Sequence, residues 1–313
     1  MSDATPPSGR EALTPTQLHV LQKLERSGPP VIFDHDDVAG LIAEAEDTMR
    51  DLSLRLGGEK LVVFKSFIAR IHGCEVLHLQ PDDCRWNPAT AAGFVAHKAI
   101  ELSLNWRGTP SPADAVDEAI ARLADQDSYR GDYIAGLTDG EHAELRGRAI
   151  DRTTKFLQQF PPLPRSAHPM LESAVRWRPP GTIEFSGKAD LVVGRPEGRE
   201  SRRLIIDFKS GGTSPVHLHD LRFYALLETL SQKIPPRRLV TYYLDYAELE
   251  VEDVTMDVLH AALMRTVDAI ERHIALTIER AAPVKKEGPA CRWCPVLTDC
   301  AEGSAYLRRT DDP

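Results

Sequence analysis

The stretches Gly187-Lys188-Ala189-Asp190 and Ile206-Asp207-Phe208-Lys209-Ser210-Gly211 decide how this chain is interpreted. Each belongs to a short apolar run, and each carries an aspartate where a buried strand would be apolar. Side chains alternate along a strand, so Asp207 and Lys209 share one face while Phe208 points to the other. A hairpin-like pairing of the two runs would place Asp190 beside Asp207. The sequence therefore predicts two carboxylates and a lysine at one edge of a sheet.

This set of side chains suits a divalent cation. Mg²⁺ prefers oxygen ligands, which Asp190 and Asp207 could supply together with the backbone carbonyl of Phe208. A bound metal would lower the pKa of a water and polarise a phosphate, and Lys209 could orient that water or neutralise developing charge. Metal-assisted cleavage of a phosphodiester requires this combination. A bare Asp-x-Lys, by contrast, is more commonly a strand that faces solvent.

Alternation and turn residues predict the surrounding elements. Strands are expected at 173–178, 183–193, 203–209, 238–245 and 248–254. Helices are expected at 89–105, 217–232 and 255–280, with two more within 14–57 and a helical stretch within 112–160. In the strand 183–193, one face would meet a cleft through Glu184, Ser186, Lys188 and Asp190. The other face would meet the core through Ile183, Phe185, Gly187, Ala189 and Leu191.

Composition places the chain among globular proteins. It has 313 residues, of which 42% are hydrophobic and 27% charged, and it contains no apolar run of membrane-spanning length. Because residues 1–9 are polar and show no apolar signal core, we expect a cytoplasmic protein with no membrane partner. A net charge of −9 gives no general attraction to nucleic acid, so contact with DNA would depend on local basic clusters.

Two helical patterns add candidate residues to the site. Gly93, His97 and Glu101 are four residues apart and share one helix face, and a neutral imidazole can bind a metal. Asp220 and Tyr224 are likewise four residues apart in the helix expected after the third strand. Taken alone, a helical histidine such as His97 is usually a surface or satisfied core residue, and a residue such as Tyr224 is more often half-buried packing.

In this order, Gly93-x3-His97-x3-Glu101, Gly187-Lys-Ala-Asp190, Asp207-Phe-Lys209-Ser-Gly and Tyr224 resemble the RecB-like branch of the PD-(D/E)XK nuclease superfamily. The resemblance covers roughly residues 62–302. It implies a DNA nuclease that uses Mg²⁺ or Mn²⁺, with His97, Asp190 and Asp207 as metal ligands. Lys209 would be the catalytic lysine, and Tyr224 would belong to the same catalytic site. The family's helix carries Gln where this chain has Asp220, which bears on rate and metal preference.

Cysteines cluster near the C-terminal end. Cys291, Cys294 and Cys300 have the spacing C-x2-C-x5-C, in which two thiolates can bind one metal from a tight turn. The stretch from Ser66 to Cys74 resembles the helix-then-cysteine entry of cluster-bearing RecB-like nucleases. That resemblance implies a [4Fe–4S] cluster held by Cys74, Cys291, Cys294 and Cys300. Cys84 is the second choice for the fourth ligand, and Zn²⁺ or uncoordinated thiols are the alternatives.

The expected fold is α/β, a PD-(D/E)XK core with a mixed central sheet of about four or five strands flanked by helices. The expected organisation begins with a disordered tail (1–13), an N-terminal helical region (14–60) and a segment with the first cluster cysteine and the His-bearing helix (61–107). A helical insertion (108–165), the nuclease core (166–280) and a cysteine module (281–313) follow. The expected function is DNA end processing or exonuclease cleavage with a preference for single strands. A helicase or another repair or defence protein could be a partner, because no ATPase motif is present. The alternatives are a non-catalytic, cluster-stabilised DNA-binding or scaffold subunit and an enzyme acting on RNA or nucleotides.

Overall fold

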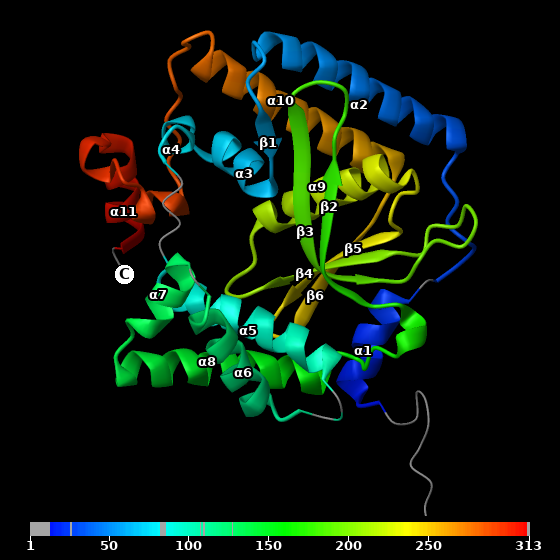
Figure 1. The fold of residues 1–313 in the computed structure, drawn as a ribbon, viewed down its shortest axis with the longest axis vertical. Coiled ribbons are helices and arrows are strands. Elements are labelled where there is room, and N and C mark those ends of the chain that lie inside the picture. The colour runs from blue at the N-terminus through cyan, green and yellow to red at the C-terminus, as the bar shows by residue number, and fades with distance from the viewer. Residues whose placement is uncertain are drawn as a thin grey trace, which may run out of the picture.

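A six-stranded mixed sheet forms the centre of the structure, and helices cover both of its faces (Figure 1). The computed structural model describes residues 13–25, 27–81, 86–106, 108, 110–126 and 128–311. The predicted α/β class is confirmed, with more strands than expected because a short strand precedes the first cysteine. Within the described residues, no helix is long and apolar enough to cross a membrane.

The strands are β1 Leu61–Val63, β2 Met170–Trp177, β3 Ile183–Val193, β4 Leu204–Lys209, β5 Arg238–Tyr243 and β6 Glu248–Asp253. The helices before the sheet's long strands are α1 Pro15–Leu24, α2 His35–Arg55, α3 Lys65–Gly73, α4 Glu75–His78, α5 Pro88–Asn105, α6 Pro112–Ala124, α7 Tyr129–Ala135 and α8 Asp139–Gln159. The later helices are α9 Pro215–Gln232, α10 Met256–Thr277 and α11 Ala301–Asp311, and short 3₁₀ turns lie at Arg165–Ala167, Pro289–Trp293 and Leu297–Asp299.

The sheet opens along one edge of β3. β2 pairs with β3 from Phe185 to Val192, so β1 and β4 must both lie on the opposite edge. β1 pairs there with residues 183–185 and runs parallel to β3, whereas β4 pairs with residues 191–193 and runs antiparallel. The carboxyl ends of β1 and β4 therefore point toward each other across residues 186–190. This opening positions the polar residues that were singled out from the sequence.

Two apolar cores hold the layers together. On one face of the sheet, α2, α3, α9 and α10 pack around fully buried side chains that include Met49, Phe185 and Ile205. On the other face, α1, α5, α6, α7 and α8 pack around Phe156, Ile206 and other buried side chains. β4 contributes to both cores, which explains its almost continuous apolar sequence.

One predicted face is wrong at a single residue. Leu191 lies in the second core, whereas Ala189 and Val192 lie in the first core. Alternation is therefore interrupted at Asp190. Glu172, which would be the partner of Asp190 in β2, has a positive φ of 50°, and the ladder skips this pair. The interruption turns Asp190 out of the regular pleat at the point where the sheet opens.

The two helices that carry site residues begin at defined caps. Asn87 caps α5 by accepting a hydrogen bond from Thr90 N at 2.9 Å, and Pro88 starts the helix. Ser214 caps α9, and Pro215 starts it. A side-chain cap typically stabilises a helix by about 1 kcal/mol, and Pro is well tolerated at the first helical position. These caps fix where His97 and Tyr224 lie along their helices.

Candidate active site and cysteine pocket

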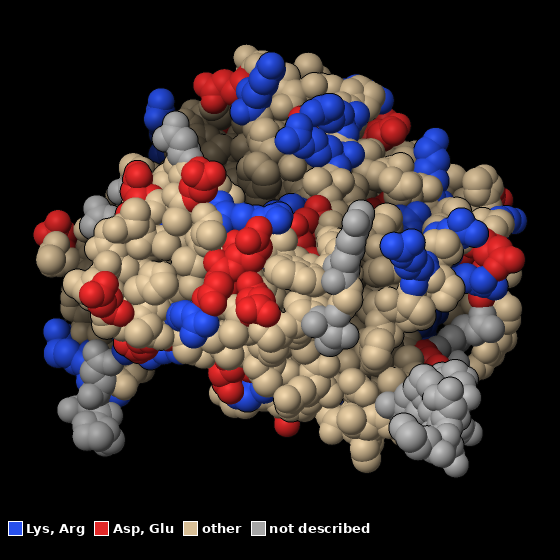
Figure 2. Space-filling view, turned by 60° about the horizontal axis from the view of Figure 1, so that its bottom comes forward, with Lys and Arg blue, Asp and Glu red and all other residues tan. Residues whose placement is uncertain are grey.

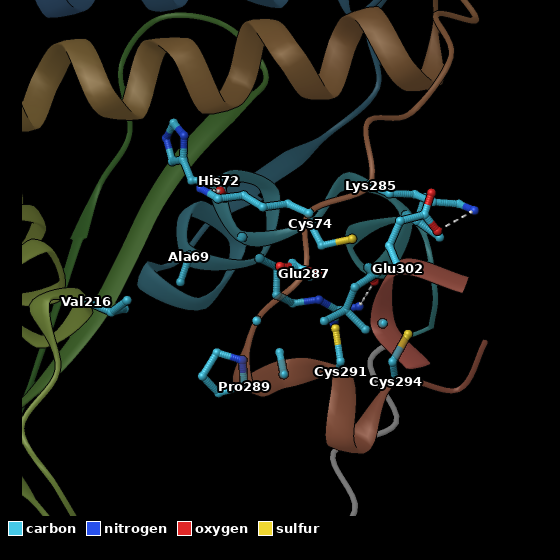
Figure 3. Close-up of a pocket in the computed structure, with 18 of the residues that line it drawn as sticks. Ala69, His72, Cys74, Val216, Lys285, Glu287, Pro289, Cys291, Cys294 and Glu302 are labelled. Carbon is cyan, nitrogen blue, oxygen red and sulfur yellow. Dashed lines mark hydrogen bonds and ion pairs between the residues drawn. The ribbon is translucent and has the colours of Figure 1, made fainter. Parts of the chain in front are cut away.

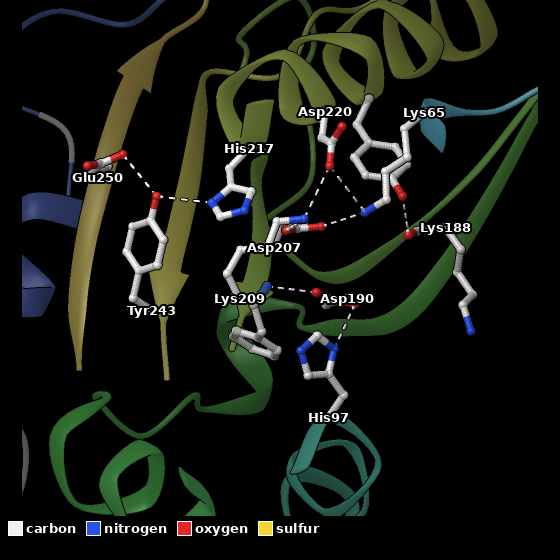
Figure 4. Close-up of polar contacts among 12 residues, drawn as sticks. Lys65, His97, Lys188, Asp190, Asp207, Lys209, His217, Asp220, Tyr243 and Glu250 are labelled. Carbon is white, nitrogen blue, oxygen red and sulfur yellow. Dashed lines mark hydrogen bonds and ion pairs between the residues drawn. The ribbon is translucent and has the colours of Figure 1, made fainter. Parts of the chain in front are cut away.

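A cavity of ≈ 750–760 Å³ occurs at each of two places in the structure, and the first is the opening of the sheet. This site cavity, of ≈ 760 Å³, is lined by residues of α3, α5, β3, β4 and α9, which Figure 4 shows converging, and by Phe64 at the end of β1. The predicted residues Asp190, Asp207, Lys209, His97 and Tyr224 all line it. Glu101, from the same helix face as His97, instead pairs with Lys98 at 2.8 Å.

Asp207 is the most deeply buried acid of the site cavity, with 1% of the residue exposed. Lys65 Nζ lies 3.0 Å from its Oδ1, and Lys209 Nζ lies 2.9 Å from its Oδ2. Burial alone would raise the pKa of Asp207, but the two ammonium groups outweigh burial and hold this pKa below its ordinary value. Asp207 is therefore a carboxylate at neutral pH.

Asp190 joins β4 to α5. Its Oδ2 accepts a hydrogen bond from Phe208 N at 2.7 Å, which replaces a ladder bond where β3 and β4 separate. Its Oδ1 lies 3.5 Å from His97 Nδ1. Burial would lower the pKa of His97, but the charge and hydrogen bond of Asp190 raise it above the ordinary value. The two acids lie close together in this arrangement, because Asp190 accepts its hydrogen bond from Phe208, the residue that follows Asp207.

Asp220, the acid at the position where the resemblance leads one to expect Gln, has two cationic neighbours. Lys209 Nζ lies 3.2 Å from its Oδ2, and Lys65 Nζ lies 4.0 Å from the same oxygen. The extra negative charge is therefore compensated inside the site. Burial alone would lower the pKa of Lys65, but Asp207, Tyr224 and Asp220 raise it above the ordinary value, so this lysine stays charged.

Tyr224 buttresses β3 at the site. Its hydroxyl donates to the Lys188 backbone oxygen at 2.8 Å, and its ring packs directly against Gly187. A Cβ on residue 187 would lie 2.5 Å from Tyr224 Cε1, so the Gly of Gly-Lys-Ala-Asp is required by close approach. Burial raises the pKa of Tyr224 to about 12, so its hydroxyl is neutral and can act only as a hydrogen-bonding group.

The turn after Lys209 is fixed from both sides. A Cβ on Gly93 would lie 2.6 Å from Ser210 Oγ, which explains the glycine one helical turn before His97. Asp245 accepts a hydrogen bond from Gly211 N at 2.6 Å and is itself held by Arg152 of α8. The Arg152–Asp245 contacts therefore connect the helical insertion to the turn that follows the predicted catalytic lysine.

Sequence reasoning missed several residues of the site cavity. Lys65 is the clearest omission, although it is the only charged residue between Leu61 and Ala69, a signal equivalent to that of Asp207. Arg130, from the insertion, also lines the site cavity, as do Phe64 and Phe94. Their sequence positions carry no motif, so only the fold brings them to the site.

The donor set of the site cavity fits a divalent cation. It offers two carboxylates and an imidazole, and the buried Oδ2 of Asp207 faces the Lys209 ammonium, 2.9 Å away. The two acids are held by lysines and by backbone, and no group of three or more His, Cys, Asp or Glu side chains in the described part of the chain has closed into metal-binding geometry. A cation would therefore bind by displacing the ammonium groups around Asp207.

The second cavity, of ≈ 750 Å³, is lined by Cys74, Cys291, Cys294 and Cys300, and we call it the cysteine pocket (Figure 3). All four are free, half-buried thiols. Cys300 precedes α11, and Gly303 N donates to its Sγ at 3.4 Å. A Cβ on Gly303 would lie 3.3 Å from Cys291 Sγ and 3.5 Å from Cys300 Sγ. Four thiols around one space, with one sulfur at a helix N-terminus, fit a metal or cluster bound through thiolates. Cys84 lies outside the described residues.

Glu75 follows Cys74 and ties the C-terminal segment to it. Its carboxylate accepts hydrogen bonds from Arg272 of α10, with Nη2 at 2.7 Å, and from Val284 N at 2.6 Å. Its own N–H donates to the Val284 backbone oxygen at 3.2 Å. The Arg272 guanidinium holds the pKa of Glu75 below its ordinary value. Glu75 is therefore a charged clamp that joins the residue after Cys74 to α10 and to the C-terminal segment.

Comparisons with known proteins give a family and two structural neighbours. A family model described as the PD-(D/E)XK nuclease superfamily matches residues 71–301. Among solved structures, a protein of Eubacterium rectale described as a putative exonuclease is 11% identical, with a TM-score of 0.45, and the match covers 82% of this chain and 95% of that one. A protein described as SSO0001 is 13% identical, with a TM-score of 0.32 and coverage of 67% and 95%. No curated protein matches the chain significantly.

Proposed function

This chain belongs to the PD-(D/E)XK nuclease superfamily, and we propose that it is a metal-dependent DNA nuclease of the RecB-like type. The observation that carries the proposal is the convergence of Asp190, Asp207, Lys209 and His97 in the site cavity. These four groups come from three separate elements, and the opening of the sheet leaves them accessible. A sheet used only for packing would have no reason to bury a carboxylate between two lysines.

We propose that Asp190, Asp207, His97 and the Phe208 carbonyl hold Mg²⁺ or Mn²⁺, which when bound supplies Lewis-acid activation of water and phosphate. Lys209 would place its ammonium beside the scissile phosphate and stabilise negative charge as it develops. Lys65 would add a second positive charge beside Asp207, which it contacts at 3.0 Å. Tyr224 would act through position, by fixing the Lys188 carbonyl and thus the backbone before Asp190.

The cysteine pocket supports a second part of the proposal. Cys74, Cys291, Cys294 and Cys300 would hold a [4Fe–4S] cluster, with Zn²⁺ as the alternative, because thiolate ligands alone suit both. The bound group would supply a covalent link between the end of α3 and the C-terminal segment. We assign it a structural role, since the four cysteines line a different cavity from the acids.

The proposed substrate is DNA with an end or a single-stranded segment, and the proposed setting is the cytoplasm. Phe64 and Arg130 of the insertion narrow the cavity beside the acids, and such a confined space suits one strand better than a stacked duplex. A helicase or another repair or defence protein would supply the strand in the cell. These assignments extend the family membership and are tested by the choice of substrate below.

Cleavage assays test the proposal directly. End-labelled single-stranded DNA, duplex DNA and RNA are incubated with the anaerobically purified protein and Mg²⁺ or Mn²⁺. Cleavage of single-stranded DNA and its loss in Asp207→Ala are expected, with the absorption of the cluster unchanged in the variant. An unchanged rate in Asp207→Ala would contradict the assigned site. Iron and zinc analysis of the same preparation separates the two metal assignments.

A second function, a non-catalytic DNA-binding or scaffold subunit, is favoured by one observation. Both acids and His97 are paired within the chain, so the site is electrostatically complete without a metal. Binding of DNA without cleavage under any metal, by a preparation loaded with its cluster, would support this alternative and reject the nuclease.

A further inference from the structure

Two exposed aromatic rings stand in the walls of the site cavity. Phe64 is 45% exposed and Phe94 is 37% exposed, and both line the cavity. Phe64 joins β1 to α3 and directly precedes Lys65. Phe94 lies on α5, three residues before His97 and therefore close to it on the helix surface. One wall of the site thus presents a partly exposed ring beside Lys65, and the other wall presents one beside His97.

Phe94 belongs to a packed set that includes a cation. The guanidinium carbon of Arg130 lies 4.5 Å from the centre of the Phe94 ring and 5.8 Å from that of Trp86. The Trp86 and Phe94 rings are 5.1 Å apart and tilted by 31°. Trp86 is only 5% exposed, so it anchors the set while Phe94 and Arg130 reach the cavity. The Arg130 guanidinium thus lies over the Phe94 ring, and a nucleobase can stack on the guanidinium plane or on the exposed part of the ring.

The net charge of the molecule gives little attraction to the DNA backbone, so affinity would have to come from contacts with the bases. Its net charge is −9, and Figure 2 shows acidic and basic side chains interspersed on a face that is recessed near its upper edge. Attraction to phosphates is therefore weak beyond the few lysines and arginines of the site. Exposed aromatic rings can supply the missing affinity through bases, which all have a stacking face whatever their sequence.

We infer that Phe64, Phe94 and Arg130 form a base-stacking subsite that binds unpaired nucleotides on either side of the scissile phosphate. The inference rests on the proposed nuclease function and adds how the protein would distinguish single-stranded DNA from a duplex. In a duplex the faces of the bases are stacked on each other, so they cannot reach rings recessed in a cavity. Unpaired bases can rotate out, and each can then cover one ring.

Binding measured without divalent cations tests the subsite separately from cleavage. The probe is a fluorescein-labelled oligothymidylate of about 12 nucleotides, followed by anisotropy in EDTA. Phe64→Leu and Phe94→Leu keep apolar volume but remove the ring, and each is expected to weaken binding about tenfold. Phe94→Tyr should bind like the wild type. Tyr246→Leu, which removes an aromatic residue that is 60% exposed outside the cavity lining, is the matched control and should have no effect.

A strand that lacks bases decides whether stacking is the cause. With an abasic oligonucleotide of the same length, wild type and the Leu variants should bind equally weakly. The inference is overturned if the variants bind oligothymidylate as tightly as the wild type does, or if the abasic strand shows the same tenfold loss. A wild type that neither binds nor cleaves DNA would instead overturn the proposed function, and the subsite with it. Circular dichroism spectra of the variants should match the wild type, because both rings are partly exposed.

Discussion

The site cavity and the cysteine pocket have similar volumes but are held together in different ways. The site cavity is framed by the sheet and by residues of the first core, and its Asp207 and Tyr224 are 1% and 5% exposed. In the described part of the chain beyond Leu276, no residue belongs to either hydrophobic core. The cysteine pocket is closed by short 3₁₀ turns and half-buried thiols. Packing therefore organises the first region, whereas the second would be organised by the bonds to sulfur of the proposed cluster.

A single helix connects the two regions. Lys65 begins α3 and Cys74 follows its last residue, nine residues later and about 14 Å along the helix axis. A change at the cysteine pocket can reach the site cavity through α3. Because α3 also packs on α9 and α10 through the buried Ile68 and Ile71, we expect that transmission to be weak. The following predictions test this separation.

The largest effect is expected from Lys209→Met. It removes the ammonium that lies 2.9 Å from Asp207 and 3.2 Å from Asp220, and we expect cleavage to slow by about 100- to 1,000-fold. Single-turnover rates with single-stranded DNA measure the loss. Lys188→Met is the control, because that lysine pairs with Glu172 at the cavity rim and its side chain is 59% exposed. Comparable losses in the two variants would mean that Lys209 acts only as one of several positive charges near the cavity, and not through its contacts with Asp207 and Asp220.

Cys291→Ser should break the cysteine pocket and leave the site cavity folded. The expected result is loss of bound iron, rapid trypsin cleavage near Lys285 and Lys286, and a lower Tm, because the C-terminal segment has no core packing of its own. The single-turnover rate should change less than in Lys209→Met. Cys84→Ser is the matched control and should retain its iron. If Cys84→Ser loses iron while Cys74→Ser retains it, the fourth ligand has been assigned to the wrong residue.

Glu75→Gln should weaken the attachment of the C-terminal segment to a smaller extent. The substitution removes the charge that pairs with Arg272, whose side chain is 33% exposed, so we expect a loss of about 1–2 kcal/mol rather than the larger cost of a fully buried pair. Urea denaturation measures the loss, and iron content should fall in parallel. Glu302→Gln, which disrupts the exposed pair with Lys285, should have a smaller effect, because solvent screens that pair. Equal effects of the two substitutions would contradict the special role of Glu75.

Several parts of this architecture could be predicted from local sequence. The strand 183–193 and the helix from 217 were recognisable because alternation, helical spacing and turn residues act over a few neighbours. Asp190, Asp207 and Lys209 were conspicuous because a charge inside an apolar run is costly unless it is used. The resemblance added His97 and Tyr224, which local spacing alone left ambiguous.

The remaining features depend on contacts between distant residues. Lys65 meets Asp207 across 142 positions of sequence, and nothing local indicates which distant acid an isolated lysine will find. Leu191 was assigned to the wrong face because the irregularity originates in the backbone of Glu172 on the neighbouring strand. Arg130 reaches the site cavity only because the insertion folds back onto α5. The spacing of apolar residues and the intrinsic preferences of residues for helix or strand carry no information about which distant residues will meet.

The smallest effect concerns two histidines where the two regions meet. His78 follows Cys74 on α4, and its Nε2 lies 3.0 Å from His273 Nδ1 on α10, with Phe67 against both rings. Burial, reinforced by the neighbouring His273, lowers the pKa of His78 to about 4, and burial also lowers that of His273. The His78 ring is therefore neutral in the folded protein at pH 6, where a histidine of the unfolded chain is already largely protonated.

A lowered histidine pKa has a defined consequence for stability. Between pH 6.5 and 4 the unfolded state binds more protons than the folded state, so the free energy of unfolding must fall as the pH falls. The rings are partly exposed, which limits the expected loss from pH 7 to pH 5 to about 1 kcal/mol. Urea denaturation at both pH values, with His78→Phe and with the exposed His35→Gln as control, measures it. The dependence should weaken in His78→Phe only, because that variant alone removes a ring of the buried pair. Equal slopes in all three proteins would show that the contact of His78 with His273 does not cause the dependence.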